Sequence, residues 1–352
     1  MMLKTFDYKT LNNLEITPEM TKKLMEISLM MGKQSTKNLK TDSTLKRLIE
    51  VAKIQSTDAS NRIEGIFTSD TRLRKIVAEK TMPHNRSEEE ISGYRDVLNL
   101  IHQQNQYIPI TSNTILTLHK HLFGFTASTW GGHYKDIDNE IIARYEDGRS
   151  EIRFTPPKAF ITPELIENLC TAYNDAINED AIPSLLLIGA FVFDFVSIHP
   201  FRNGNGRMSR LLMLLTMYKS GFEVGKFISI ESLIEKTKPA YYVSLQNSSR
   251  NWATNKNSYQ PFLDYFLSIV LQAYRDLQDR LQPSEKKISV TNSIINNLQD
   301  KLYPLSKREL SSLIPEYSLI TIERALKELL DSKRIKKVGA GRSTKYILIF
   351  SK

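Results

Sequence analysis

The chain has 352 residues, of which 25% are charged and 41% hydrophobic, a composition typical of a globular protein with two or three domains. The sequence shows no signal peptide and no apolar stretch of the roughly 18 to 20 residues that span a membrane, so we expect a cytoplasmic protein with no membrane partner. Because Cys170 is the single cysteine, we also expect no internal disulfide. The net charge is +9, and residues 285–352, with 14 Lys and Arg against 7 Asp and Glu, carry +7 of it, so an acidic partner is considered for that segment first.

The first third of the chain has the apolar spacing of helices. Thr17-Pro18-Glu19 is typical of a helix N-terminus, and so is Ser87 followed by three glutamates. His119 and His121 stand two residues apart and would point in different directions on a helix, which argues against a shared metal. The expected helices cover residues 20–31, 44–54, 87–102 and 111–123.

A short polar segment, Ser60-Asn61-Arg62-Ile63-Glu64-Gly65, lies within residues 56–66. Ser60 and Glu64 are one helical turn apart, and glycine at position 65 commonly ends a helix. From this spacing alone, the segment is interpreted as the end of a surface helix.

A β-hairpin is expected over residues 139–156. Two strand-like runs, residues 140–145 and 150–154, flank Asp147-Gly148, a dipeptide that favours tight turns. An isolated hairpin is marginally stable, so we expect it to lie on a helical body as a lid or a docking flap.

The most apolar part of the chain is residues 185–198, whose hydrophobic side chains would cover the whole circumference of a helix. It follows a helix expected over residues 162–178, and it should end at His199, because Pro200 disfavours helical backbone there.

The loop after this helix has the residues of an anion site. Gly204-Asn205-Gly206 can adopt positive φ angles and lead into a helix beginning near Arg207, so backbone N–H groups would converge on an anion. Arg207 and Arg210 would share one helix face and offer two forked cations to a polyphosphate. Beside them, a neutral His199 is suited to act as a general base. The alternative is a buried histidine at a helix end with glycines that serve only the turn.

Residues 199–210 resemble the signature of the Fic family, His-x-Phe-x-acidic-Gly-Asn-Gly-Arg-x-x-Arg, at seven of its eight defined positions. The resemblance extends to about residue 283. It implies a mainly α fold and the transfer of AMP from ATP to a Ser, Thr or Tyr hydroxyl of a target protein or of the chain itself. His199 would be the base and Arg210 the γ-phosphate contact. The nucleotide-binding segment would comprise Gly204, Asn205, Gly206, Arg207, Met208 and Ser209.

The departure from the signature is Asn203, where the family has an acidic residue that holds Mg²⁺. An amide oxygen lacks the charge of a carboxylate, so the resemblance implies a weakened Mg²⁺ site.

The same resemblance gives other segments a role. Ser60 and Glu64 would belong to an inhibitory helix whose glutamate pairs with Arg210 in place of the γ-phosphate. The hairpin would be the flap that registers a target peptide by strand addition. Tyr242, or otherwise Tyr241, would lie near the nucleotide, with a core aromatic pair as the alternative.

Residues 284–352 resemble a winged helix, with three short helices followed by a basic, glycine-tipped hairpin. Thr321, Arg324 and Lys327 could read bases, but Glu323 and Glu328 cancel the positive charge of the same helix. Such domains bind DNA or dock proteins, so DNA, a protein partner and a homodimer stay open.

The sequence thus predicts an N-terminal helical region (1–110), a catalytic core (111–283) and a winged-helix domain (284–352). An autoinhibited adenylyltransferase is the leading hypothesis. A nucleotide-sensing DNA-binding regulator and an enzyme that removes AMP are the alternatives.

Overall fold

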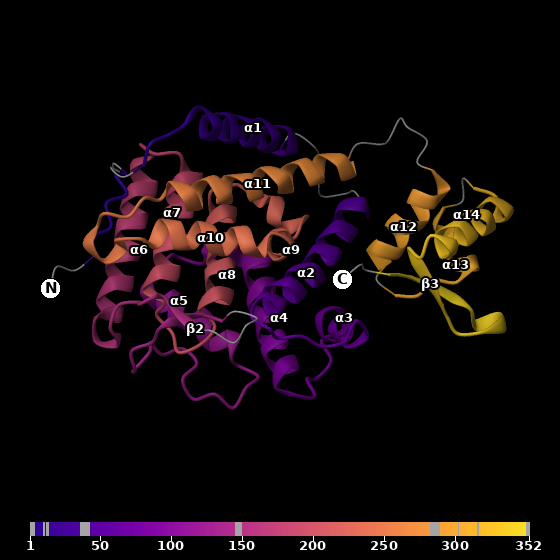
Figure 1. Cartoon of the computed structure of the whole chain (residues 1–352), viewed down its shortest axis with the longest axis horizontal. Coiled ribbons are helices and arrows are strands. Elements are labelled where there is room, and N and C mark those ends of the chain that lie inside the picture. The colour runs from indigo at the N-terminus through magenta and orange to yellow at the C-terminus, as the bar shows by residue number, and fades with distance from the viewer. Residues whose placement is uncertain are drawn as a thin grey trace. The chain divides into compact units, whose positions relative to one another are not determined.

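The computed structural model describes residues 4–9, 11, 14–35, 43–144, 150–281, 289–301, 303–314 and 317–349. The chain divides into two compact units, Met1–Asp279 and Arg280–Lys352. The prediction of a mainly helical protein is confirmed (Figure 1). No helix in the described ranges is long and apolar enough to cross a membrane.

The first unit is built of helices that pack side by side, with α7 among them (Figure 1). Its helices are α1 Pro18–Ser35, α2 Ser43–Ile63, α3 Asp70–Glu79, α4 Arg86–Gln104, α5 Ser112–Leu122, α6 Thr162–Glu179, α7 Ser184–Ile198, α8 Asn205–Lys219, α9 Ile230–Lys236, α10 Lys238–Ser249 and α11 Gln260–Leu281. Short 3₁₀ turns lie at Asn105–Tyr107, Ala159–Ile161, Glu223–Lys226 and Trp252–Thr254.

Helix α7 is almost entirely buried, because it packs between α6 and α8 and its apolar side chains surround the helix. Its one charged residue, Asp194, is also fully buried. The carboxylate accepts hydrogen bonds from the Tyr8 hydroxyl (2.6 Å), the Tyr259 hydroxyl (2.8 Å) and the Trp252 indole N–H (2.5 Å). These bonds fix α7 to the N-terminal segment and to the segment between α10 and α11, and α7 is followed directly by His199.

Helix α2 differs from expectation in two ways. The predicted helix over 44–54 continues through the first part of the segment 56–66 as one helix that ends at Ile63, since no Gly or Pro interrupts it before that residue. Its last two turns are also partly buried, because α2 packs against α4 and α9 and leaves Ser60 and Asn61 with no exposed area, whereas Glu64 and Gly65 just beyond its end are exposed. The surface interpretation therefore holds for Glu64 and Gly65 but was wrong for Ser60 and Asn61.

The expected hairpin is present as β1 Ile141–Arg144 and β2 Ser150–Phe154, which pair antiparallel. The predicted turn Asp147-Gly148 lies outside the described residues. Strand β2 packs on α10, where the Arg153 guanidinium donates to the Tyr242 carbonyl and lies 5.0 Å from the Tyr242 ring. The hairpin thus rests on the helical body.

The second unit contains α12 Val290–Lys301, α13 Lys307–Leu313 and α14 Leu319–Asp331, followed by the antiparallel pair β3 Ile335–Val338 and β4 Lys345–Leu348. An isolated bridge between Leu305 and Tyr346 adds a short third segment to this sheet. Apolar residues from all three helices and the sheet form one core. The segment predicted to join the units, Gln282-Pro283-Ser284-Glu285, lies outside the described residues, and the three-part domain division stays a prediction.

Candidate active site

His199 lies at the C-terminal end of α7 in left-handed conformation, with φ of 50°. Its ring Nδ1 is 3.3 Å from the Val196 carbonyl oxygen. Because a carbonyl only accepts, Nδ1 carries the proton and Nε2 keeps a free lone pair. Burial, followed by the charge of Lys135, lowers the pKa of His199 to about 4. The ring is therefore neutral at pH 7 and able to accept a proton.

Asn205 and His119 hold the loop that follows His199. The Asn205 amide accepts from the Phe201 N–H and donates to the Phe201 carbonyl, both at 2.8 Å. The Phe201 ring stacks on His119, with the ring centres 3.6 Å apart. Asn205, predicted to bind phosphate with its neighbours, thus directs its side chain at the loop itself.

The glycines of the loop behave differently from one another. Helix α8 begins at Asn205, two residues earlier than expected, so only Gly204 has a positive φ (+81°) and Gly206 is helical. The prediction of successive positive φ angles was therefore wrong for Gly206. Glycine is needed at position 206 for a steric reason, because a Cβ there would lie 2.2 Å from the Glu64 carboxylate. The candidate anion site is therefore the first turn of α8, whose N–H groups lack helical acceptors.

Arg210 is held by the end of α2. Its Nε donates to the Ser60 hydroxyl (2.8 Å), and its Nη2 donates to the Ser60 carbonyl (2.9 Å) and to the Glu64 carboxylate (2.7 Å). Burial alone would raise the pKa of Glu64, but the adjacent Arg210 outweighs it and holds that pKa below its ordinary value. Ser60 and Glu64, which lie 150 and 146 residues from Arg210 in sequence, thus form one polar cluster with it.

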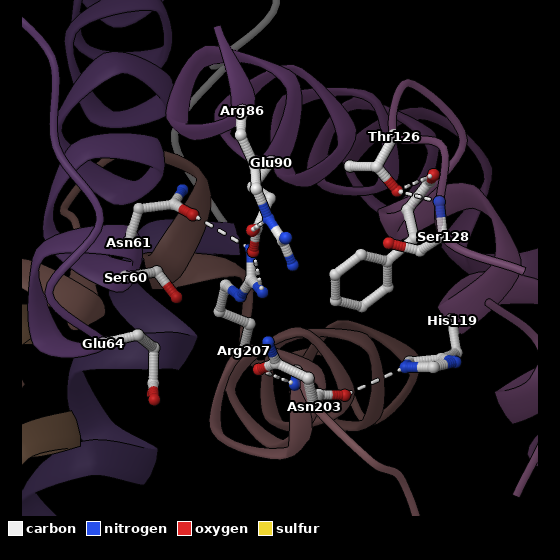
Figure 2. A network of polar contacts seen from close by, with 12 residues as sticks. Ser60, Asn61, Glu64, Arg86, Glu90, His119, Thr126, Ser128, Asn203 and Arg207 are labelled. Atoms are coloured by element: carbon white, nitrogen blue, oxygen red, sulfur yellow. Dashed lines mark hydrogen bonds and ion pairs between the residues drawn. The ribbon is translucent and has the colours of Figure 1, made fainter. Parts of the chain in front are cut away.

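Arg207 occupies a separate position from Arg210. Its Nη2 donates to the Glu90 carboxylate of α4 at 2.6 Å, and its Nη1 donates to the Asn61 side-chain oxygen at 3.3 Å (Figure 2). The guanidinium is fully buried and lies 5.1 Å from the Phe123 ring. The expected pair of free cations on one face is therefore not what the structure shows. Glu90 was missed because nothing in its spacing links it to the loop.

Asn203 is exposed, and its side-chain oxygen accepts from the Gly204 N–H at 2.6 Å. Its backbone carbonyl is 3.1 Å from His119 Nε2 (Figure 2), while His119 Nδ1 accepts from the Gly132 N–H at 2.9 Å. His119 therefore carries its proton on Nε2 and anchors the loop. Sequence reasoning considered this histidine only as a metal ligand.

The donor set around Asn203 does not fit a strong Mg²⁺ site. Magnesium in proteins is held by one or two carboxylates together with substrate phosphates, and Asn203 offers a neutral amide. Within the described ranges, no three His, Cys, Asp or Glu side chains gather where they could hold a metal ion.

A pocket of about 190 Å³ lies where these elements meet. His199, Gly206, Arg210 and Glu64 line one part of it, and Tyr241 and Tyr242 another. Tyr242 is half-buried, whereas Tyr241 is 5% exposed and packs on Phe262 and Tyr265. The hairpin contributes Ile141, Arg153 and Phe154.

Several predicted site residues do not line this pocket. Met208 and Ser209 are fully buried in α8, and the Ser209 hydroxyl donates to the Gly206 carbonyl at 2.7 Å. The other predicted residues that do not line it are Ser60, Asn203, Gly204, Asn205 and Arg207. The sequence analysis did not identify Lys135. In the structure, its ammonium donates to the carbonyl of Ile198, the residue before His199, at 3.3 Å.

Residues 109–217 match the Fic/DOC family model. The chain is 28% identical over 188 residues to the protein adenylyltransferase Fic of Nematostella vectensis, covering 51% of this chain and 40% of the relative. It is 38% identical over 78 residues to a Fido domain-containing protein of Dictyostelium discoideum, covering 21% of this chain and 54% of that protein. The chain thus carries a Fic/DOC segment, and one of these two relatives is named a protein adenylyltransferase. The chain spans 40% and 54% of the lengths of the two relatives.

Solved structures share the fold. A Fic family protein from Desulfovibrio desulfuricans superposes with a TM-score of 0.61 at 20% identity, covering 97% of this chain and 98% of that one. Fic-1 from Caenorhabditis elegans gives a TM-score of 0.57 at 21% identity, covering 74% of this chain and 72% of that one.

Proposed function

We propose that the chain is an autoinhibited protein adenylyltransferase that transfers AMP from ATP to a Ser, Thr or Tyr hydroxyl of a target protein or of itself. The observation that carries the proposal is a pocket shared by the neutral His199, the N-terminal turn of α8 and Arg210, with Glu64 bound to Arg210. The relative named a protein adenylyltransferase supports the same chemistry.

In this reaction, His199 Nε2 accepts the proton of the target hydroxyl while its oxygen bonds to the α-phosphorus of ATP. The bond from the α-phosphorus to the bridging oxygen breaks, and diphosphate leaves. The N–H groups of the first α8 turn and the Arg210 guanidinium are placed to stabilise the charge on the phosphoryl oxygens.

The proposed autoinhibition rests on the group that binds the Arg210 guanidinium. The Glu64 carboxylate holds the guanidinium at 2.7 Å, where a terminal phosphate would otherwise bind. A γ-phosphate would meet a like charge at this position, so ATP would bind in a pose that does not place the α-phosphorus beside His199.

Intact-mass spectrometry tests the proposal directly. Purified protein is incubated with ATP and MgCl₂, alone and with a cell extract, and a gain of one AMP on the chain or on a partner supports transfer. Loss of AMP from a previously modified protein would instead favour an AMP-removing enzyme with Glu64 in a catalytic role. No mass change in either direction would favour a nucleotide sensor.

The pKa of His199 predicts an unusual pH profile. A base must be deprotonated to act, and a pKa of about 4 means that the ring stays neutral well below pH 6.5. We expect kcat/KM to stay level from pH 7 to about pH 5 and to fall tenfold per pH unit only below about pH 4. A fall centred near pH 6.5 would contradict the assigned environment of His199.

We also propose that the flap hairpin docks an extended target segment, since β1 and β2 border the pocket.

A cytoplasmic location accords with Cys170, which is buried as a free thiol.

For the second unit, which we interpret as a winged helix, we favour DNA as partner. Lys336, Lys337 and Lys345 are exposed on its β3–β4 hairpin, whereas Glu323 on α14 pairs with Lys307 at 2.7 Å. We expect the affinity of the full chain for random duplex DNA to fall steeply with salt, and to fall less steeply when Lys336 and Lys337 are alanine. Binding that is absent or insensitive to salt would favour a protein partner or a homodimer.

A further inference from the structure

A buried lysine lies beside the candidate base, outside the lining of the pocket. Lys135 is 4% exposed, although lysine is rarely buried without a carboxylate partner. Its ammonium donates to the Asn139 side-chain oxygen at 2.9 Å and to the Ile198 carbonyl at 3.3 Å. Within the described part of the chain this ammonium has no ion pair, so neutral oxygens alone accept from it. Burying an unpaired charge costs free energy, so a gain in stability does not explain the position of this lysine.

The segment that carries Lys135 binds the backbone on both sides of His199. The residue before the histidine accepts from the lysine ammonium. The Pro200 carbonyl, on the residue after it, accepts from the Lys135 backbone N–H at 2.8 Å. The Asn139 amide adds a longer contact to the Phe201 carbonyl, at 3.5 Å. The backbone of the candidate base is thus held from both sides by one segment.

The charge of Lys135 also suits the end of α7. The last carbonyls of a helix lack helical N–H partners and form the negative end of its dipole, so a cation is favourable there. One of these carbonyls, of Val196, orients the His199 ring, and another, of Ile198, binds the ammonium. Burial lowers the pKa of Lys135 to about 8, so the lysine is still charged at pH 7. After burial, this charge is the largest cause that lowers the pKa of His199.

We propose that Lys135 is a positioning residue for His199, which fixes the backbone of the base and, through its charge, keeps the imidazole neutral. Asn139 orients the ammonium, and β1 begins two residues after Asn139, so the flap hairpin and the base share one anchor. The inference rests on the proposed function for its activity readout. Two further measurements, of the pKa of His199 and of amide hydrogen exchange, do not depend on any transfer reaction.

Lys135→Met tests the inference, because it keeps an unbranched side chain and removes the ammonium. In the Glu64→Gly background, we expect kcat for AMP transfer to fall about 10- to 100-fold, the effect of a misplaced reacting group. The affinity for ATP should match that of the parent protein, because Lys135 does not line the pocket. A fall in kcat at unchanged ATP affinity is the result expected of a residue that positions the base.

Histidine NMR measures the base directly. In the otherwise wild-type protein, we expect Lys135→Met to raise the pKa of His199 from about 4, since the removed charge is positive. The other charged side chains that line the pocket with His199 are unaltered, namely Glu64, Arg153 and Arg210. Amide hydrogen exchange over residues 198–204 should also rise, because the loop loses a bond that holds it.

Lys23→Met is the matched control. The Lys23 ammonium of α1 also donates to a backbone carbonyl, that of Asp264 at 3.2 Å, but α1 contributes no residue to the pocket. We expect its kcat, its pKa of His199 and its exchange over residues 198–204 to match those of the parent protein.

The outcomes separate this inference from the proposed function. An unchanged pKa of His199 in Lys135→Met, or unchanged exchange over residues 198–204, overturns the inference, and so does an unchanged kcat in an enzyme that transfers AMP. Both changes without AMP transfer by any variant support the positioning role and overturn the transferase. If Lys135→Met does not fold, Asn139→Ala keeps the lysine and removes the oxygen that orients it. Its exchange over residues 198–204 is then measured with the same expected and contradicting results.

Discussion

Replacing His199 by alanine is expected to lower the rate of AMP transfer by about 10²- to 10⁴-fold, the usual contribution of a general base. His199 Nε2 is the free basic nitrogen of the pocket, because Nδ1 is committed to the Val196 carbonyl. ATP should still bind, because the α8 N-terminus and Arg210 do not depend on the imidazole. The measurement is the rate of labelling in the Glu64→Gly background, with ATP affinity determined by calorimetry.

Backbone strain is the main confounding effect, since position 199 has a φ of 50° and alanine is disfavoured there. His199→Asn separates the two effects, because asparagine tolerates left-handed backbone but cannot act as a base. Both variants should lose activity to a similar degree. His121→Ala, an exposed histidine on α5, is the control and should keep it. A His199→Asn variant that transfers AMP at the unaltered rate would remove His199 from the base role.

The parts of the fold that the sequence could predict are those fixed by local chemistry. The uniform apolar surface of residues 185–198 requires a buried helix, and Pro200 after His199 requires that helix to end there, as α7 does. The hairpin strands likewise follow from alternation around a turn dipeptide. These features depend on neighbouring residues alone.

The connections between helices could not be predicted in this way. Arg207 and Arg210 are three residues apart and look equivalent in the sequence. In the structure, Arg207 pairs with Glu90, whereas Arg210 pairs with Glu64 at the pocket. Glu90 comes from α4 and Glu64 from the residue after α2, and each lies at least 117 residues from its arginine. Helical spacing gives the direction of a side chain but not the partner that another helix brings to it.

The two ion pairs also differ in what they permit. The Arg207–Glu90 pair has side chains 0% and 7% exposed, so breaking it would leave an uncompensated buried charge. In the Arg210–Glu64 pair, the arginine is only 2% exposed but keeps two hydrogen bonds to Ser60, whereas the glutamate is 33% exposed and can leave toward water. The first pair is thus suited to permanent structure, and the second to a contact that opens.

Glu64→Gly should therefore raise labelling by an ATP analogue about 10- to 100-fold, the factor that corresponds to a hydrogen bond between charged groups. The backbone should tolerate the change, because residue 64 lies just beyond the end of α2 and is followed by Gly65. Arg210 keeps its two bonds to Ser60 and stays oriented toward the pocket. The measurement is the initial rate of labelling together with ATP affinity.

A second variant separates charge from shape. Glu64→Gln keeps the volume of the side chain but removes the negative charge, so it should show part of the increase in labelling expected for Glu64→Gly. The control is Glu50→Gln, at an exposed position of α2, and its labelling should match wild type. If inhibition came only from the bulk of the side chain, Glu64→Gln would label no better than wild type while Glu64→Gly would still be active. If neither variant exceeded wild type, Glu64 would not be an inhibitor, and its place beside His199 in the pocket would favour a role in removing AMP.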